Sequence, residues 1–155
     1  MDDYITKHGD ALSHEEGIIV HGCNCHGVMG AGIAKSIKNC FPNAYNVYRH
    51  EYENNGLFLG NITYTMVLPN KIIVNANTQY DTGTDKRYVN YEAVAKCFSK
   101  VLELADLQYS KTGKKLDIVF PMIGAGLAGG NWKIIETIIL ETIGNKYRKI
   151  LYLFP

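Results

Sequence analysis

Short apolar runs alternate along the chain with longer segments in which apolar residues recur every three or four positions. The short runs have the length and the Val, Ile and aromatic content of β-strands. Two of them alternate apolar and polar residues and are joined only by Leu68-Pro69-Asn70, which predicts a β-hairpin. The expected strands are residues 17–22, 61–67, 71–77, 115–121 and 149–154.

The longer segments predict amphipathic helices between these strands. In one of them Val94, Phe98 and Val101 recur at helical spacing and would form a buried face. Strands that alternate with helices favour a largely parallel sheet covered on both faces. Ligands of such sheets bind beyond the carboxyl ends of the strands. The expected helices are residues 31–40, 44–56, 88–110 and 131–144.

Length and composition favour a single domain that spans residues 1–155. The 16 Lys and Arg residues nearly balance the 15 Asp and Glu residues, so the clustered positive charge that DNA or RNA requires is missing. No apolar run reaches the ~18 residues of a membrane span, and the N-terminus MDDYITKHGD lacks the pattern of a signal peptide. We therefore expect a cytoplasmic protein (in the host cytoplasm if a phage encodes it) with reduced cysteines, and neither nucleic acid nor membrane as partner.

Two glycine-rich segments each follow an expected strand and lead into an expected helix. They are HGCNCHGVMGAGIA (21–34) and PMIGAGLAGGNW (121–132), and neither contains Lys or Arg. Such loops can still bind anions, because backbone N–H groups and a helix N-terminus supply the donors. Glycine also lets the backbone approach a ligand closely. Two such loops at equivalent strand ends predict two walls around a phosphate-bearing ligand, although tight strand-to-helix turns without a ligand would have the same pattern.

Other interpretations of these segments fit less well. The second segment matches the G-x-G-x-x-G spacing, but too few strands follow it for a dinucleotide-binding domain. Neither segment ends in Gly-Lys-Ser/Thr as a P-loop does. His21, Cys23 and Cys25 alternate along the chain, yet this is not a usual zinc spacing, and no neighbouring group marks out either thiol as a nucleophile. We expect the cysteines to pack in the interior, and we expect no metal and no other cofactor.

Gly9-Asp10, the segment 21–34 and IGAGLAGG (123–130) together resemble the macrodomain family, and the resemblance covers nearly the whole chain. It implies a three-layer α/β/α fold with a central mixed, mostly parallel sheet, and an ADP-ribose derivative as small-molecule partner. In that family an early aspartate, here Asp10, accepts from the adenine amino group. The segment 21–34 would place Asn24 at the distal ribose and Met29 to Ala34 along the diphosphate, with 123–130 as the second phosphate loop.

Within the family, the segments 21–34 and NTQYDTGTDKRYVNYEA (77–93) look most like the yeast-type and phage-type ADP-ribose 1″-phosphate phosphatases. A histidine opens the first segment in those enzymes, and His21 holds that place here. Related terminal ADP-ribose glycohydrolases use a lysine and an aspartate, which would fall at Gln79 and Ala128 and are missing. The resemblance therefore implies a phosphatase acting on ADP-ribose 1″-phosphate. A non-catalytic reader of ADP-ribose or ADP-ribosylated protein, or a hydrolase of another ADP-ribose derivative, stays the alternative, and the oligomeric state stays open.

For the reaction, His21 is the expected proton-transfer residue and Asn24 is expected to fix the ribose beside it, although a strand-end histidine can equally be structural. Asp81 and Asp85 are the carboxylates that could assist, unless they only shape the 77–88 loop, and His26 would rim the first loop. The residues expected to contact the ligand are Gly9, Asp10, Ala11, Gly22, Cys23, Asn24, Met29, Gly30, Ala31, Gly32, Ile33, Ala34, Thr78, Gln79, Ile123, Gly124, Ala125, Gly126, Leu127, Ala128 and Gly129.

Overall fold

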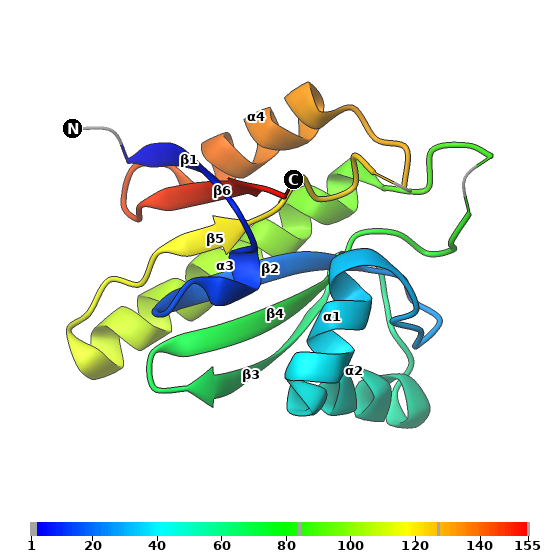
Figure 1. The fold of residues 1–155 in the computed structure, drawn as a ribbon, viewed down its shortest axis with the longest axis horizontal. Helices are drawn as coiled ribbons and strands as arrows, with labels where there is room; N and C mark the ends of the chain where they lie inside the picture. Colours follow the sequence, from blue (N-terminus) through cyan, green and yellow to red (C-terminus); the bar gives the residue numbers. More distant parts are fainter. Residues whose placement is uncertain (1–2, 84, 127, 155) are drawn as a thin grey trace.

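The computed structural model describes residues 3–83, 85–126 and 128–154, and its centre is a six-stranded sheet in the order β1-β6-β5-β2-β4-β3. Neighbouring strands run parallel except β3 and β4, which form the antiparallel hairpin expected from the sequence. The sheet is thus mixed and mostly parallel, as predicted (Figure 1). The strands are β1 (Tyr4–His8), β2 (Gly17–Cys23), β3 (Ile62–Leu68), β4 (Lys71–Asn77), β5 (Ile118–Phe120) and β6 (Lys149–Leu153).

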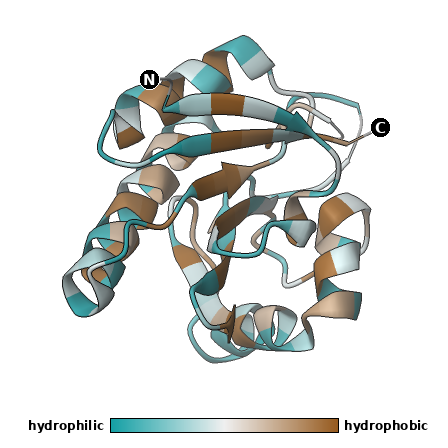
Figure 2. Ribbon diagram, turned by 60° about the vertical axis from the view of Figure 1, so that its left-hand side comes forward, coloured by the Kyte–Doolittle hydropathy of each residue, from teal (hydrophilic) through white to brown (hydrophobic). Residues whose placement is uncertain are grey.

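Helices cover both faces of this sheet. The elements are α1 (Gly32–Cys40), α2 (Pro42–Asn54), α3 (Tyr91–Thr112), α4 (Trp132–Ile143) and a short 3₁₀ turn, η1 (Ala11–Ser13). Helices α1 and α2 pack on one face, and α3 and α4 pack on the other (Figure 1). Brown, hydrophobic segments follow the central strands, whereas teal segments gather on outer helix turns and loops (Figure 2). The predicted α/β/α layering is confirmed.

Strand β2 shows why both faces are apolar. Ile18 and Val20 point into the cluster shared with α3 and α4, whereas Ile19 and Cys23 point into the cluster shared with α1 and α2. A strand buried on both faces needs apolar residues at consecutive positions, which is the pattern that the sequence displays at 17–22. None of the helices in the described ranges is both long and apolar enough to cross a membrane.

Two features differ from the sequence-based expectation. Strand β1 was not expected, because YITKH has only two strongly apolar residues and its last three positions are exposed at the sheet edge. It pairs in parallel with β6, from Tyr4 beside Lys149 to His8 beside Leu153. Strand β5 is shorter than expected and covers only Ile118–Phe120.

The β3–β4 turn contains Asn70 in the left-handed region (φ 59°), which asparagine tolerates better than most residues.

Candidate functional site

A cleft of about 840 Å³ lies at the carboxyl ends of the parallel strands. The segments after β1, β2, β4, β5 and β6 all contribute to it, because parallel strands bring these ends to one edge of the sheet. Its volume is in the range of small-molecule sites. The expected ligand-contacting residues that line it are Gly9, Asp10, Ala11, Gly22, Cys23, Asn24, Gly30, Ala31, Gly32, Ile33, Ala34, Gln79, Ile123, Gly124, Gly126 and Ala128.

Four of the expected residues (Met29, Thr78, Ala125 and Gly129) do not line the cleft, and Leu127 lies outside the described residues. Met29 is 2% exposed and packs in the cluster below α1 and α2. Thr78 is fully buried behind Gly22, since a Cβ on Gly22 would come within 2.8 Å of Thr78 Oγ1. Ala125 and Gly129 shape the second loop, donating backbone N–H groups to the carbonyls of Met122 and Gly126. These four residues do not line the cleft, and their contact with a ligand stays a prediction.

The cleft also includes residues that were not expected. Tyr152 is the penultimate residue of β6 and the 75% exposed Phe154 follows this strand, whose carboxyl end lies between those of β1 and β5. Their position at the end of an apolar strand was the available signal. The remaining unexpected lining residues are Val28, Ser36, Thr82, Gly83, Pro121 and Met122.

The first glycine loop ends in a helix whose N-terminus has no side-chain cap. Helix α1 follows Ala31, whose methyl group can accept no hydrogen bond, whereas Asn90 and Asn131 cap α3 and α4 through their side chains. First-turn N–H groups have no partner within their own helix. In α1 they lie beside the cleft, where Gly30 to Ala34 line the wall. Such an N-terminus attracts an anion through its donors and its dipole.

Asn24 is held rigidly at the other end of this loop. Its Nδ2 donates to the Val28 carbonyl at 2.8 Å, and its Oδ1 accepts from the His26 N–H at 2.9 Å and from the Tyr48 hydroxyl at 3.0 Å. Asn24 is 7% exposed and lines the cleft. These bonds fix the loop that connects β2 to α1, so any group bound beside Asn24 meets a preorganised wall.

Asp10 lines the cleft from the segment after β1, the strand at the edge of the sheet. Its Oδ1 accepts from the Leu12 N–H at 2.9 Å and so caps the turn η1. Asp10 itself is exposed and lines the cleft. A carboxylate has acceptor capacity beyond this one bond. It can therefore accept a further hydrogen bond from a ligand.

His21 lies beneath the cleft and is completely buried. Its Nε2 lies 2.6 Å from Asn75 Oδ1, and burial lowers the pKa of its imidazole to about 4, an effect that the Asn75 bond partly offsets. It is not among the described residues that line the cleft. A proton-transfer residue must come within hydrogen-bond reach of the reacting group. This placement therefore does not support the catalytic role expected for His21, which stays an untested prediction.

The cysteines of the first loop are packing residues, as expected. Cys23 and Cys25 are 3% and 4% exposed and belong to the cluster below α1 and α2. Burial raises the pKa of both thiols, that of Cys25 to about 11, which disfavours the nucleophilic thiolate. Within the described ranges, His, Cys, Asp and Glu side chains nowhere gather in threes close enough to hold a metal ion.

A family model, the Macro domain, matches residues 20–139, a range that begins within β2 and includes the first glycine loop, the helices α1, α2 and α3, and the second glycine loop. The chain belongs to the Macro domain family. The macrodomain resemblance expected from Gly9-Asp10 and the two glycine segments is thereby confirmed.

Relatives and solved structures agree with this assignment. The macrodomain is 29% identical to an enterobacteria phage T4 protein described as a 17.5 kDa protein in the tk-vs intergenic region, covering 96% of this chain and 93% of that one. It is 28% identical to a Candida albicans protein named ADP-ribose 1″-phosphate phosphatase, covering 86% and 89%. A Bacteroides thetaiotaomicron structure matches with a TM-score of 0.84 at 26% identity, covering 98% of both chains. The Thermosipho africanus DarTG structure, solved in complex with ADP-ribose, matches at a TM-score of 0.74 and 20% identity, covering 94% of this chain and 40% of that one.

Proposed function

We propose that this macrodomain binds an ADP-ribose derivative in the cleft and hydrolyses ADP-ribose 1″-phosphate to ADP-ribose and phosphate. The observation that carries the binding proposal is the uncapped N-terminus of α1, which lines the same cavity as Gly124 and Gly126 of the second loop. A diphosphate between these two walls would receive backbone donors from both. The ADP-ribose bound in a structure of the same fold is consistent with this ligand.

The two ends of the cleft suit the two ends of such a ligand. Asp10 offers a carboxylate oxygen that can accept from the exocyclic amino group of adenine. Asn24, at the far end of the first loop, would lie beside the distal ribose. The backbone loops between them would hold the diphosphate. The ligand would thus run from β1 across α1 to the end of β2.

The choice of reaction rests on the residues at two cleft positions and on the relatives. Gln79 and Ala128 both line the cleft, at the positions where related glycohydrolases would carry their lysine and aspartate. Neither residue can supply an ammonium or a carboxylate. Several relatives that match most of this chain carry the name ADP-ribose 1″-phosphate phosphatase. Hydrolysis of a phosphate monoester demands mainly positioning and charge stabilisation, which a preorganised cleft can provide.

Two measurements test this proposal. Calorimetry with ADP-ribose should show binding that survives an excess of chelator, since the donors are backbone groups. Phosphate release from ADP-ribose 1″-phosphate should be catalysed under the same conditions. AMP, a phosphate monoester without a distal ribose phosphate, serves as the comparison substrate. Binding without release would favour a reader of ADP-ribose, and absence of both would refute the proposal.

A further inference from the structure

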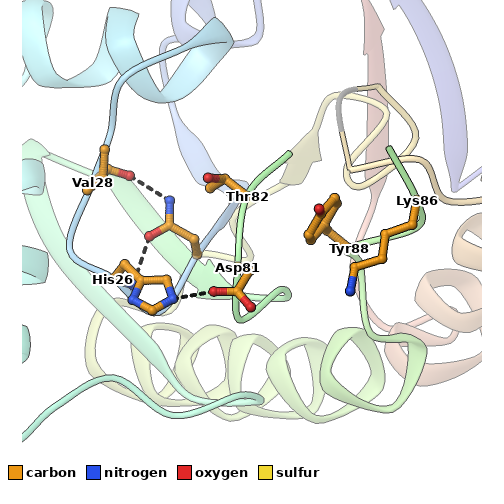
Figure 3. Close-up of a pocket in the computed structure, with 7 residues that line it drawn as sticks. His26, Val28, Asp81, Thr82, Lys86 and Tyr88 are labelled. Carbon is orange, nitrogen blue, oxygen red and sulfur yellow. Dashed lines mark hydrogen bonds and ion pairs between the residues drawn. The ribbon is translucent and has the colours of Figure 1, made fainter. Parts of the chain in front are cut away.

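A second, smaller pocket of about 290 Å³ lies beside the cleft, at the end that Asn24 lines. Asn24, Val28 and Thr82 line both cavities, so the two meet beside the residue expected at the distal ribose. Four further residues line only the smaller pocket. They are His26, Asp81, Lys86 and Tyr88 (Figure 3). We call this the distal pocket.

Its charge differs from that of the cleft. Lys86 is the one Lys or Arg among the described residues that line either cavity. Its Nζ lies 5.2 Å from the centroid of the Tyr88 ring, and it forms no ion pair with the other described residues. Backbone donors suffice for a diphosphate, whereas a terminal phosphate monoester carries up to two charges on one group and favours a cation. Lys86 is therefore the cation available to a terminal phosphate on a ribose held beside Asn24.

A histidine–carboxylate pair forms the opposite side of the distal pocket. His26 Nε2 lies 2.6 Å from Asp81 Oδ1, and the two side chains keep 43% and 59% of their surface exposed (Figure 3). The rings of Tyr80 and His26 pack edge to face, with ring centroids 4.8 Å apart. A carboxylate that orients one ring nitrogen leaves the other to exchange a proton with a bound group. His26 is thus an oriented imidazole that lines the distal pocket and keeps part of its surface exposed, whereas His21 is fully buried.

The surrounding loops hold this pair in place. Asn24 Oδ1 accepts from the His26 backbone N–H, so the residue expected at the ribose also positions His26. Gln79 Nε2 donates to the Asp81 carbonyl at 2.8 Å. The other nearby carboxylate, Asp85, does not line the pocket and accepts a hydrogen bond from the Tyr88 hydroxyl. Of the two carboxylates considered from the sequence, the geometry therefore selects Asp81.

We propose that the distal pocket is the subsite for the 1″-phosphate, with Lys86 as its counter-charge and His26, oriented by Asp81, as the general acid. This rests on the proposed function. A water oxygen forms the new bond to phosphorus while the bond from phosphorus to the ribose oxygen breaks, and protonated His26 gives its proton to that oxygen. The products are ADP-ribose and dihydrogen phosphate, which returns a proton to His26 and leaves as hydrogen phosphate. No oxidant, reductant or further reactant is needed.

The kinetic test compares His26→Gln with His50→Gln, which alters an exposed histidine on α2 away from both cavities. His26→Gln should lower kcat for phosphate release about 10²-fold or more, the scale of a lost proton-transfer group. ADP-ribose affinity should change less than about threefold, because the cleft contacts that bind the product remain. Asp81→Asn should lower kcat in the same direction and His50→Gln should not. Wild-type kcat in His26→Gln would overturn the role of His26.

The binding test separates the subsite from the reaction. In the His26→Gln background, ADP-ribose 1″-phosphate should bind about tenfold or more tightly than ADP-ribose, and adding Lys86→Gln should remove that preference. Lys86→Arg should keep it, and Lys133→Gln on α4 is the matched control. Equal affinities of His26→Gln for ADP-ribose 1″-phosphate and ADP-ribose would overturn the phosphate subsite. If wild-type protein releases no phosphate but shows the Lys86-dependent preference, the subsite stands, whereas the phosphatase proposal and the role of His26 both fail.

Discussion

His21 and Asn75 form a buried hydrogen bond between neighbouring strands, with His21 Nε2 2.6 Å from Asn75 Oδ1. The Asn75 Nδ2 donates to the Ala44 carbonyl at 2.9 Å and to Thr63 Oγ1 at 3.0 Å. A carbonyl only accepts, so the Ala44 contact fixes the orientation of the Asn75 amide. Its Oδ1 must then face His21, and the imidazole must donate from Nε2. This chain of bonds joins β2, β4, β3 and α2 beneath the cleft.

Stability should fall with acidity because His21 is buried in its neutral form. Burial lowers the pKa of His21 from 6.5 to about 4 in the folded chain. The unfolded chain therefore takes up this proton at higher pH, so the contribution is complete above pH 6.5 and is lost as the pH falls to 4. The loss should be about 3 kcal/mol in the free energy of unfolding. Urea unfolding at a series of pH values measures it.

His21→Gln is the informative variant for this pH effect, and His8→Gln, at an exposed site on β1, is its control. The slope of unfolding free energy between pH 6.5 and 4 should become shallower in the first variant and stay unchanged in the second. An unaltered slope in His21→Gln would show that other groups cause the acid sensitivity.

The turnover of the same His21→Gln variant distinguishes a structural role of His21 from a catalytic one. From its burial we expect kcat for phosphate release to stay within about fivefold of wild type in protein that remains folded. A proton-transfer residue would instead cost about 10²–10⁴-fold. A loss of that size at unchanged ADP-ribose affinity would restore the catalytic role expected from the sequence.

A substitution in the second glycine loop should weaken ligand binding without affecting folding. Gly126 lines the cleft, and a Cβ there meets nothing within 4 Å, so Gly126→Val should fold but place its side chain where phosphate would lie. ADP-ribose affinity should fall at least about 100-fold, or about 2.7 kcal/mol. Calorimetry and thermal unfolding measure the two properties. Retained affinity would show that this loop does not contact the ligand.

Gly130→Ala is the contrasting variant. A Cβ on Gly130 would lie 2.5 Å from the Val89 side chain and 2.6 Å from the Gly124 carbonyl oxygen. Overpacking of this kind should cost about 1–3 kcal/mol of stability. Its melting temperature should therefore drop, whereas that of Gly126→Val should not.

Asp10 should determine the preference for adenine. Its carboxylate can accept from the adenine amino group but is repelled by the carbonyl of hypoxanthine, so wild-type protein should prefer ADP-ribose to its inosine analogue. A hydrogen bond to a charged group contributes about 1.5–3 kcal/mol, so the preference should be at least about tenfold. Asp10→Asn can keep the bond to the Leu12 N–H while presenting a donor, and should shift the preference toward the inosine analogue. Equal wild-type affinities for both ligands would place Asp10 away from the base.

The sequence by itself determined the layers of the fold and the edge of the sheet where the cleft lies. Both follow from local pattern: consecutive apolar residues at 17–22 demand a strand covered on two faces, and glycines after β2 and β5 demand tight turns at the same edge. Strand β1 was not predicted, because an edge strand buries too little surface to require an apolar run. It forms through pairing with β6, almost the whole chain away.

Only the tertiary structure decided which histidine meets the cavities. Side chains of a strand alternate between faces, so His21 shares the face of Ile19 and Cys23 and points under α2, but the sequence does not say which face is covered there. His26 lies five residues later in a loop, where no regular periodicity determines the direction of a side chain. Its contact with Asp81 spans 55 positions and depends on loops that hydrogen bonds such as that from the Cys25 N–H to the Tyr80 carbonyl bring together. Local patterns fix periodic elements, whereas meetings between distant loops are fixed by packing and hydrogen bonds that exist only in the folded chain.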